Sequence, residues 1–206
     1  MPLHIGTHID ALCHAWCDDQ LYNGHDPNEI SSTRGAGKCG VDKLPPVVAR
    51  GILLDVAGAH EGPLAPGYSI GQAELSDTAK RAGISLQRGD AVLIRTGWLE
   101  QQAGLPPRAV DFNIEPGIDV EAALWLAESG VVLVGADNFA IEAMPFPDGK
   151  VFPVHQRLIR DYGIPLLEGV VLAELAALDL AEFMFVAAAL PIVGGTGSPL
   201  TPLAIF

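Results

Sequence analysis

Residues 4–14 constrain this chain more than any other segment, because they read HIGTHIDALCH. Three imidazoles and one carboxylate therefore fall within eleven positions. Neutral imidazole and carboxylate hold borderline divalent ions such as Zn²⁺ or Mn²⁺, and a site with three protein ligands keeps a position open for water. The segment predicts a metal centre of the catalytic kind, with one histidine left over as a base.

The segment must bend for these ligands to meet. Four extended residues span about 13 Å, which is too far for His4 and His8 to share one ion. Gly6 lies midway between them and can take a positive φ. A bend there lets His4, His8 and Asp10 point to one side. The residues expected to pack behind the site are Ile5, Thr7 and Ile9.

The cysteines offer a rival interpretation. The chain has an odd number of them and no secretion signal, so we expect reduced thiols at Cys13, Cys17 and Cys39. With His14 or His8 they could form a closed structural zinc site of the Cys₃His type. That site lacks a paired CxxC motif and leaves His4 and Asp10 without a role. A nucleophilic Cys13 is a further alternative, although adjacent residues such as Cys13 and His14 seldom align as nucleophile and base.

Composition narrows the possible partners and location. The chain has 206 residues, of which 49% are hydrophobic, enough for one domain with a real core. Its 12 Lys and Arg against 25 Asp and Glu give a net charge of −13, which repels nucleic acid and anionic membranes. The most apolar tract, 184–193, is too short to span a bilayer. We expect a cytoplasmic protein that binds neither nucleic acid nor membrane.

Hydrophobic patterning alternates between short apolar runs and helical segments. Buried strands are expected at 52–56, 91–95, 131–134 and 184–188. Helices are expected at 70–82, 120–129, 155–162 and 172–181, the first three of which end at a glycine. Segments rich in turn residues at 23–39, 61–67 and 104–116 are expected loops. The alternation predicts an α/β fold, and spacing alone suggests a doubly wound sheet.

The first segment closely resembles the signature HxGTHxDxPxH of the "Putative cyclase" family, which includes bacterial kynurenine formamidases and isatin hydrolases. The chain departs from this signature at Leu12, where the family usually has proline, so the turn before His14 is less constrained. Later segments resemble further family blocks in the same order: GADN at 135–138, FPVHQ at 152–156, GIPLLE at 163–168 and VGGTGSP at 193–199. The resemblance covers most of the chain.

The resemblance implies a fold and a set of site residues. The fold is the family's swivelling β/β/α architecture with a mixed, barrel-like sheet. The family's metal ligands correspond to His4, His8 and Asp10, and its catalytic histidine corresponds to His14. Two further site positions, which would hold a second ion or assist catalysis, correspond to His155 and Glu168. Trp16, two residues after His14, is a candidate for substrate contact, with core packing as the alternative.

The resemblance also implies a reaction. We expect Mn²⁺ or Zn²⁺, as one or two ions, to assist hydrolysis of a small linear or cyclic amide of the aryl-formamide or lactam kind, with His14 as general base and His155 as its assistant. A lactone hydrolase would use the same residues.

The signature begins at residue 4, so residues 1–206 are expected to form a single cyclase-like domain that lacks the family's N-terminal segment. This start favours a homo-oligomer, and it raises the alternative of a metal-binding homologue without turnover.

Overall fold

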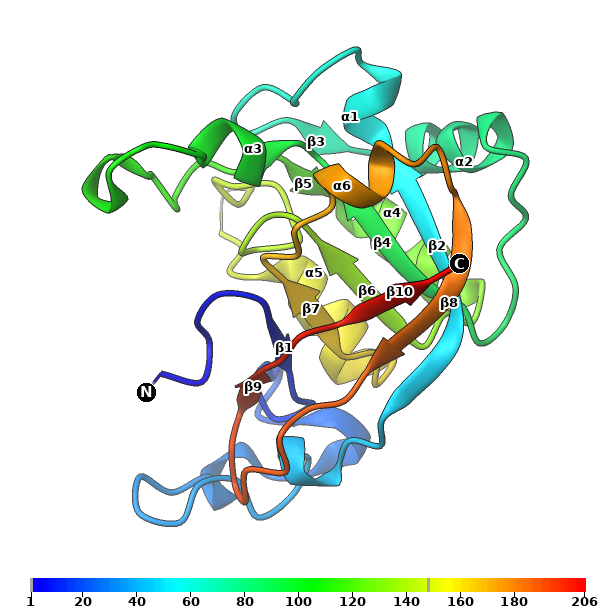
Figure 1. Cartoon of the computed structure of the whole chain (residues 1–206). Helices are drawn as coiled ribbons and strands as arrows, with labels where there is room; N and C mark the ends of the chain where they lie inside the picture. The colour runs from blue at the N-terminus through cyan, green and yellow to red at the C-terminus, as the bar shows by residue number, and fades with distance from the viewer. Residues whose placement is uncertain (1, 148) are drawn as a thin grey trace.

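A computed structural model describes residues 2–147 and 149–206. Its main feature is one mixed sheet of eight strands in the order β10-β8-β2-β4-β6-β7-β1-β9. The sheet curls into a half barrel, so that β8 and β10 pass in front of β4 and β6 (Figure 1). A second sheet pairs β3 with β5. The strands are β1 (His8–Asp10), β2 (Val47–Asp55), β3 (Ser69–Ile70), β4 (Ala91–Arg95), β5 (Gly117–Ile118), β6 (Leu133–Ala136), β7 (Leu166–Glu168), β8 (Glu182–Ala187), β9 (Gly197–Pro199) and β10 (Leu203–Ile205).

In the described part of the chain six α-helices accompany the sheets, and several are short. The helices are α1 (Val56–Ala59), α2 (Gln72–Arg81), α3 (Trp98–Gln102), α4 (Val120–Glu128), α5 (Pro153–His155) and α6 (Ala173–Ala176), and α5 continues as a π-helical segment, Gln156–Asp161. Helix α4 begins where the carboxylate of Asp119 accepts the Ala122 N–H at 2.8 Å, and it is followed by Gly130 at φ +78°.

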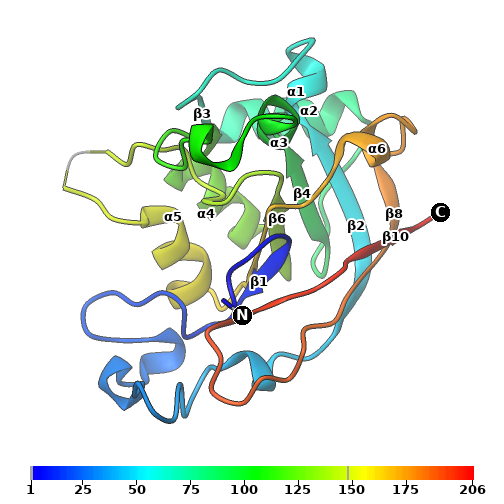
Figure 2. The ribbon, with the colours of Figure 1, turned by 60° about the vertical axis from the view of Figure 1, so that its left-hand side comes forward.

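Side chains alternate between two cores along each central strand. Ile52 and Leu54 of β2 face the helices, whereas Leu53 between them faces the inside of the half barrel. The outer core joins the sheet to α2, α4 and α5, and the inner core is closed by β8 and by Leu175 of α6. Figure 2 shows α4 and α5 on one side of the sheet and β8 and β10 on the other.

The expected elements are present with changes at their ends. The predicted strands correspond to β2, β4, β6 and β8, but β6 begins at Leu133 rather than Val131. The helix predicted at 172–181 was wrong in length: only α6 forms, because Asp179 takes a left-handed conformation at φ +54°. Strands β1, β3, β5, β7, β9 and β10 were not predicted, because two or three residues carry no readable alternation.

The edge at β10 exposes apolar side chains. Leu203 and Ile205 pair in register with Val186 and Met184 of β8, and Leu203, Ile205 and Met184 are each about half exposed. Such an edge is compatible with the expected homo-oligomer, which stays a prediction. None of the helices in the described part of the chain combines the length and hydrophobicity needed to cross a membrane.

Candidate metal centre

Strands β1 and β7 place three acidic or imidazole side chains on the helix-facing side of the sheet. His8 and Asp10 alternate with Ile9, which packs into the inner core, so both point the other way. The antiparallel register sets His8 opposite Glu168. The His8 Nε2 atom lies 3.2 Å from Glu168 Oε2 and 3.6 Å from Asp10 Oδ1.

The predicted bend lies at Gly6, whose φ is +58°. The carbonyl oxygen of Gly6 lies 2.9 Å from His8 Nδ1, so an Nδ1–H that donates to it leaves Nε2 free for the site. The bend also brings His4 back, with its Nδ1 atom 2.8 Å from Asp10 Oδ1. Of the residues expected behind the site, Ile9 is buried but Ile5 is 47% exposed, so that part of the prediction was wrong.

The segment before β9 supports the His4 ring. Thr196 Oγ1 lies 2.9 Å from His4 Nε2, which leaves Nδ1 to face Asp10. Gly197 provides the space, since a Cβ atom there would meet His4 Cε1 at 2.6 Å. This glycine-rich segment therefore serves as a support for one of the candidate ligands.

Helix α5 supplies His155, which lies 145 residues after Asp10 in the chain. Its Nε2 atom lies 3.7 Å from Asp10 Oδ2 and 3.3 Å from Glu168 Oε1. Buried Glu142 orients the ring: it accepts the backbone N–H groups of Val154 and His155 and lies 2.7 Å from His155 Nδ1. A carboxylate behind an imidazole is the usual support of a metal-binding histidine.

His14 completes the group from the loop after β1. Its Nε2 atom lies 3.9 Å from Asp10 Oδ2, and its ring stacks on His4 at a centroid distance of 4.2 Å. Burial and the neighbouring imidazoles of His4 and His155 lower the pKa of His14, although Asp10 opposes the shift. A lowered pKa keeps the ring neutral at neutral pH, as a base requires.

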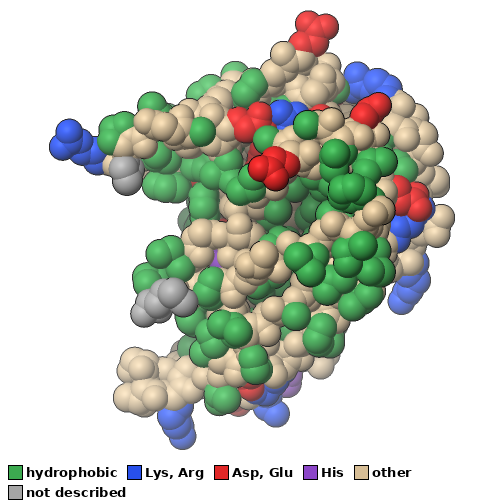
Figure 3. All heavy atoms as spheres, in the orientation of Figure 1, with side chains coloured by type: hydrophobic (Ala, Val, Ile, Leu, Met, Phe, Trp, Pro, Cys, Tyr) green, Lys and Arg blue, Asp and Glu red, His purple; other side chains and the backbone are tan. Residues whose placement is uncertain are grey.

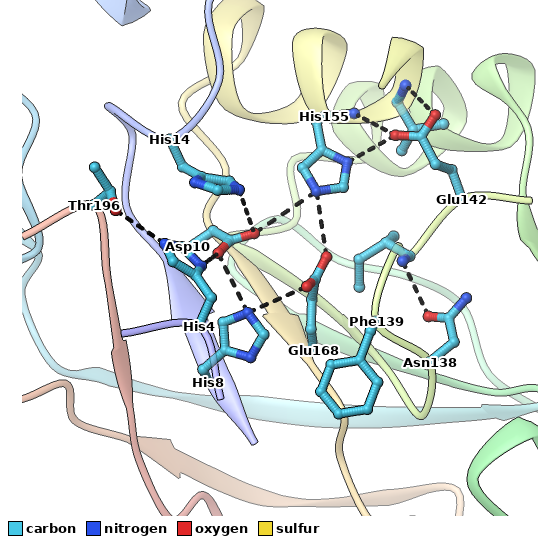
Figure 4. Close-up of polar contacts among 12 residues, drawn as sticks. His4, His8, Asp10, His14, Asn138, Phe139, Glu142, His155, Glu168 and Thr196 are labelled. Carbon is cyan, nitrogen blue, oxygen red and sulfur yellow. Dashed lines mark hydrogen bonds and ion pairs between the residues drawn. The ribbon is translucent and has the colours of Figure 1, made fainter. Parts of the chain in front are cut away.

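The side chains converge on Asp10 from both sides (Figure 4). Two sets of ligand atoms each lie within 4.8 Å of one another: one from His4, His8 and Asp10, the other from Asp10, His14 and His155. Oδ1 of Asp10 faces the first set and Oδ2 faces the second. The geometry can therefore hold one ion on either side of Asp10, or two ions that share it.

Imidazole nitrogens lie close to the carboxylates at the centre, the nearest being His4 Nδ1 at 2.8 Å from Asp10 Oδ1, but they are not well aligned for hydrogen bonds. Both oxygens of Asp10 and Oε1 of Glu168 are buried, and none accepts a well-aligned hydrogen bond from the described residues. Orphaned buried carboxylate oxygens are costly, and a divalent cation would satisfy them. The residues therefore fit a metal ion of the type that imidazole and carboxylate bind.

The pKa shifts of Asp10 and His155 both indicate that the carboxylates at the centre are negatively charged. Burial alone would raise the pKa of Asp10, but His4, and the charges of His14 and His155, hold it below its usual range. Burial lowers the pKa of His155, but Glu142 and Glu168 outweigh it and raise that pKa to about 10. Carboxylates that hold a proton on a fully buried imidazole would also attract a divalent cation.

The structure does not support the two interpretations that give the cysteines a functional role. No cysteine belongs to a metal-compatible group of three among residues 2–147 and 149–206. Cys13 is buried with its Sγ atom 3.7 Å from the Gly195 carbonyl oxygen, and burial raises the pKa of its thiol to about 11. A buried thiol of this pKa is a poor nucleophile and a poor metal ligand. The structural zinc site of Cys13, Cys17 and Cys39 is not formed.

A cavity of 790 Å³ opens beside His14 and His155. Its apolar wall includes Trp16, which is 54% exposed, so the alternative of core packing for Trp16 was wrong. Phe152 lines the same cavity, with its ring 4.8 Å from that of His155. In Figure 2 the segment after β1 lies beside α5, and these two segments form most of the lining. A pocket of this size suits a small aromatic molecule.

Aromatic side chains cover the other side of the centre. The Phe139 ring lies 6.1 Å from that of His8 and contacts Trp98 and Phe112. Figure 3 shows a hollowed face with hydrophobic side chains around it and a histidine at its floor. Apolar walls around the carboxylates exclude water and so strengthen the field at the centre.

Glu115 is a buried carboxylate behind Phe139, whose N–H it accepts at 2.8 Å. Burial raises the pKa of Glu115 to about 7, and the negative charge of Glu168 adds to the shift. A carboxyl whose pKa is higher in the folded than in the unfolded state binds its proton more tightly when folded. The free energy of unfolding therefore falls as pH rises from about 4.3 towards 7, and the loss is complete above that pH.

Glu115→Gln, which removes this titration and keeps an acceptor for Phe139, is expected to stabilise the protein relative to wild type at pH 8 by about 2–3 kcal/mol more than at pH 5. Denaturant unfolding at the two pH values measures this difference. Exposed Glu121→Gln in α4 is the matched control and should show no such pH dependence. An equal offset for Glu115→Gln at both pH values would contradict the shifted pKa.

Sequence reasoning missed the supports of the centre. Glu142, Thr196 and Gly197 position His155 and His4, but each is distant in sequence from the histidine it supports. Asp137, in the block at 135–138, accepts both N–H groups of the turn after β4, from Thr96 and Gly97. No local spacing marks these residues, because their partners are set by the packing of separate strands.

Comparisons with known proteins agree with this geometry. A family model described as "Putative cyclase" matches residues 1–143. No match to a curated protein was found. A solved structure described as a novel cyclase is 35% identical, with a TM-score of 0.92, and the match covers 100% of this chain and 69% of that one.

Two other solved structures are less similar in sequence. Isatin hydrolase A from Ralstonia solanacearum is 25% identical, with a TM-score of 0.74 and coverage of 98% of this chain and 71% of that one. A potential metal-dependent hydrolase with cyclase activity is 22% identical, with a TM-score of 0.64 and coverage of 99% and 78%. At 22% identity the likeness supports the fold alone.

Proposed function

The chain belongs to the "Putative cyclase" family, and from this premise we propose that it is a metal-dependent hydrolase that opens the carbon–nitrogen bond of a small linear or cyclic amide, of the aryl-formamide or lactam kind. The observation that carries the proposal is the state of Asp10: both its oxygens are buried without a well-aligned hydrogen bond, and each has two imidazole nitrogens within 3.9 Å. The likeness to isatin hydrolase A adds support for hydrolysis of a cyclic amide.

We propose Mn²⁺ or Zn²⁺ as the ion, because imidazole and carboxylate suit both. His4, His8 and Asp10 would hold one ion. A second ion would share Asp10 and use His155 and Glu168, whose Nε2 and Oε1 atoms lie 3.3 Å apart. Such an ion supplies a water of lowered pKa and polarises the substrate carbonyl.

The protein's own groups carry the proton transfers. Neutral His14 lines the cavity and faces Asp10, so its Nε2 atom can take the proton of the attacking water. The protonated ring then returns that proton to the departing nitrogen, which leaves as an amine. Glu142 and Glu168 hold the pKa of His155 high, so His155 is a weaker candidate for the base and is assigned to support of the centre.

A substrate screen tests the proposed function. Metal-loaded protein is offered formyl-aryl amides, lactams and lactones, and product is followed by chromatography. We expect turnover of an amide or lactam that stops when the metal is removed and returns when it is restored. Turnover of lactones alone would reassign the bond, and metal binding without turnover of any compound would leave a metal-binding homologue.

A further inference from the structure

A tight turn at residues 17–20 carries an acidic side chain to the catalytic cavity. The Cys17 N–H donates to the Gln20 carbonyl at 3.1 Å, and the Gln20 N–H donates back at 3.0 Å. The two central residues, Asp18 and Asp19, both have positive φ, of 51° and 54°. Turns of this kind favour Asn-Gly or Asp-Gly, so two adjacent aspartates are not what turn formation alone would select.

The two aspartates lie in different surroundings. Asp19 lines the cavity of 790 Å³ that also contains His14 and His155, whereas Asp18 does not. The hydrogen bond to Asp161 raises the pKa of Arg160, and the charge of Asp18 adds to that shift. Arg160 also donates to Gln20 Oε1. One turn therefore holds a carboxylate near a cation and another carboxylate at the cavity.

Most of the remaining lining side chains are apolar, amide or imidazole, with the hydroxyl of Thr196 and the thiol of Cys13 in addition. Trp16, Ile30, Val151 and Phe152 form apolar walls, and Asn28 and Gln156 contribute amides. Among the described lining residues, Asp19 is the only one with a carboxylate and none is a lysine or arginine. Asp19 would repel an entering anion, and the His155 imidazole, which also lines the cavity, already faces the carboxylates of Glu142 and Glu168. An entering ammonium group would meet a carboxylate and the face of an indole, both of which attract it.

We propose that Asp19 is a specificity determinant, which favours substrates with an ammonium group on the end remote from the scissile bond and disfavours those with a carboxylate there. The inference rests on the proposed function, because it assumes that this cavity receives the substrate. It narrows the substrate class to neutral or cationic aryl amides. The recognition resides in a residue that belongs to neither of the two candidate metal-ligand groups.

Three matched formanilides test the proposal, with aminomethyl, hydroxymethyl or carboxylate at the para position. Dissociation constants for the metal-loaded protein are measured by calorimetry, and kcat/KM is measured where turnover occurs. We expect the aminomethyl compound to bind about three- to fivefold more tightly than the hydroxymethyl compound, and the carboxylate compound to bind more weakly by a similar factor. In Asp19→Asn these ratios should fall towards one, and in Asp19→Lys they should invert.

Asp18→Asn is the matched control, because asparagine suits the turn at either position and only the charge at the cavity differs. It should keep the wild-type ratios. Equal binding of all three compounds by wild type, or the same loss of selectivity in Asp18→Asn as in Asp19→Asn, would overturn the proposal. Charge-selective binding without turnover would support the role of Asp19 and refute the hydrolase. Turnover of the hydroxymethyl compound with no charge selectivity would support the hydrolase and refute the role of Asp19.

Discussion

Asp10→Asn is expected to release the bound metal and to reduce hydrolysis about 10³-fold or more, because both candidate ion positions use this carboxylate. Asparagine keeps the shape of the side chain and offers one neutral oxygen in place of two charged ones. His4→Ala and His8→Ala should also lose metal, since each removes a nitrogen that faces Oδ1. Elemental analysis of purified protein measures metal content, and the rate on the screened substrate measures activity.

The cysteines provide the control for this prediction. Cys17→Ser and Cys39→Ser should keep their metal, because neither cysteine belongs to a metal-compatible group among the described residues. Metal content unchanged in Asp10→Asn, His4→Ala and His8→Ala would refute the centre. Loss of metal in the cysteine variants, with metal retained in the other three, would instead support the structural zinc site.

His14→Ala is expected to keep the metal and to lose about 10²–10⁴-fold in kcat, the usual contribution of a positioned proton-transfer group. The substitution removes the neutral imidazole that faces the cavity, and leaves His4, His8 and Asp10 in place. Steady-state kinetics on metal-loaded protein, with metal content measured on the same sample, separates the two roles. Loss of metal together with rate would make His14 a ligand of a second ion.

His25→Ala is a suitable control, since His25 lies outside both ligand groups and should leave rate and metal unchanged. Full activity in metal-loaded His14→Ala would refute the assignment of His14 as the general base. His155 would then be the next candidate, and its pKa, raised by Glu142 and Glu168, would have to fall when the ion binds.

The sequence predicted the first half of the centre because that half is local. His4, His8 and Asp10 lie within seven residues, and a bend at Gly6 is enough to bring them together. His155 and Glu168 are brought to Asp10 only by the pairing of β1 with β7 and by the packing of α5 on the sheet, so only the family resemblance indicated them.

The α/β cyclase-like fold with a mixed, curled sheet was also predicted through the resemblance, and the structural neighbours confirm it. Patterning alone suggested a doubly wound sheet, because three of the four strands it detected, β2, β4 and β6, are parallel, and the spacing did not reveal that the fourth, β8, is antiparallel. The antiparallel strands that close the half barrel, such as β9 and β10, were too short to be detected.

Strand β1 lies between β7 and β9, so residues 8–10 are paired with residues 166–168 and 197–199. These pairings close chain loops of more than 150 residues, the slowest kind of contact to form because of its entropic cost. The ligand-rich segment precedes both of its partner strands in the chain, so it has no support until they are in place. High-affinity metal capture should therefore be a late folding event, completed only when β7 and β9 have paired with β1.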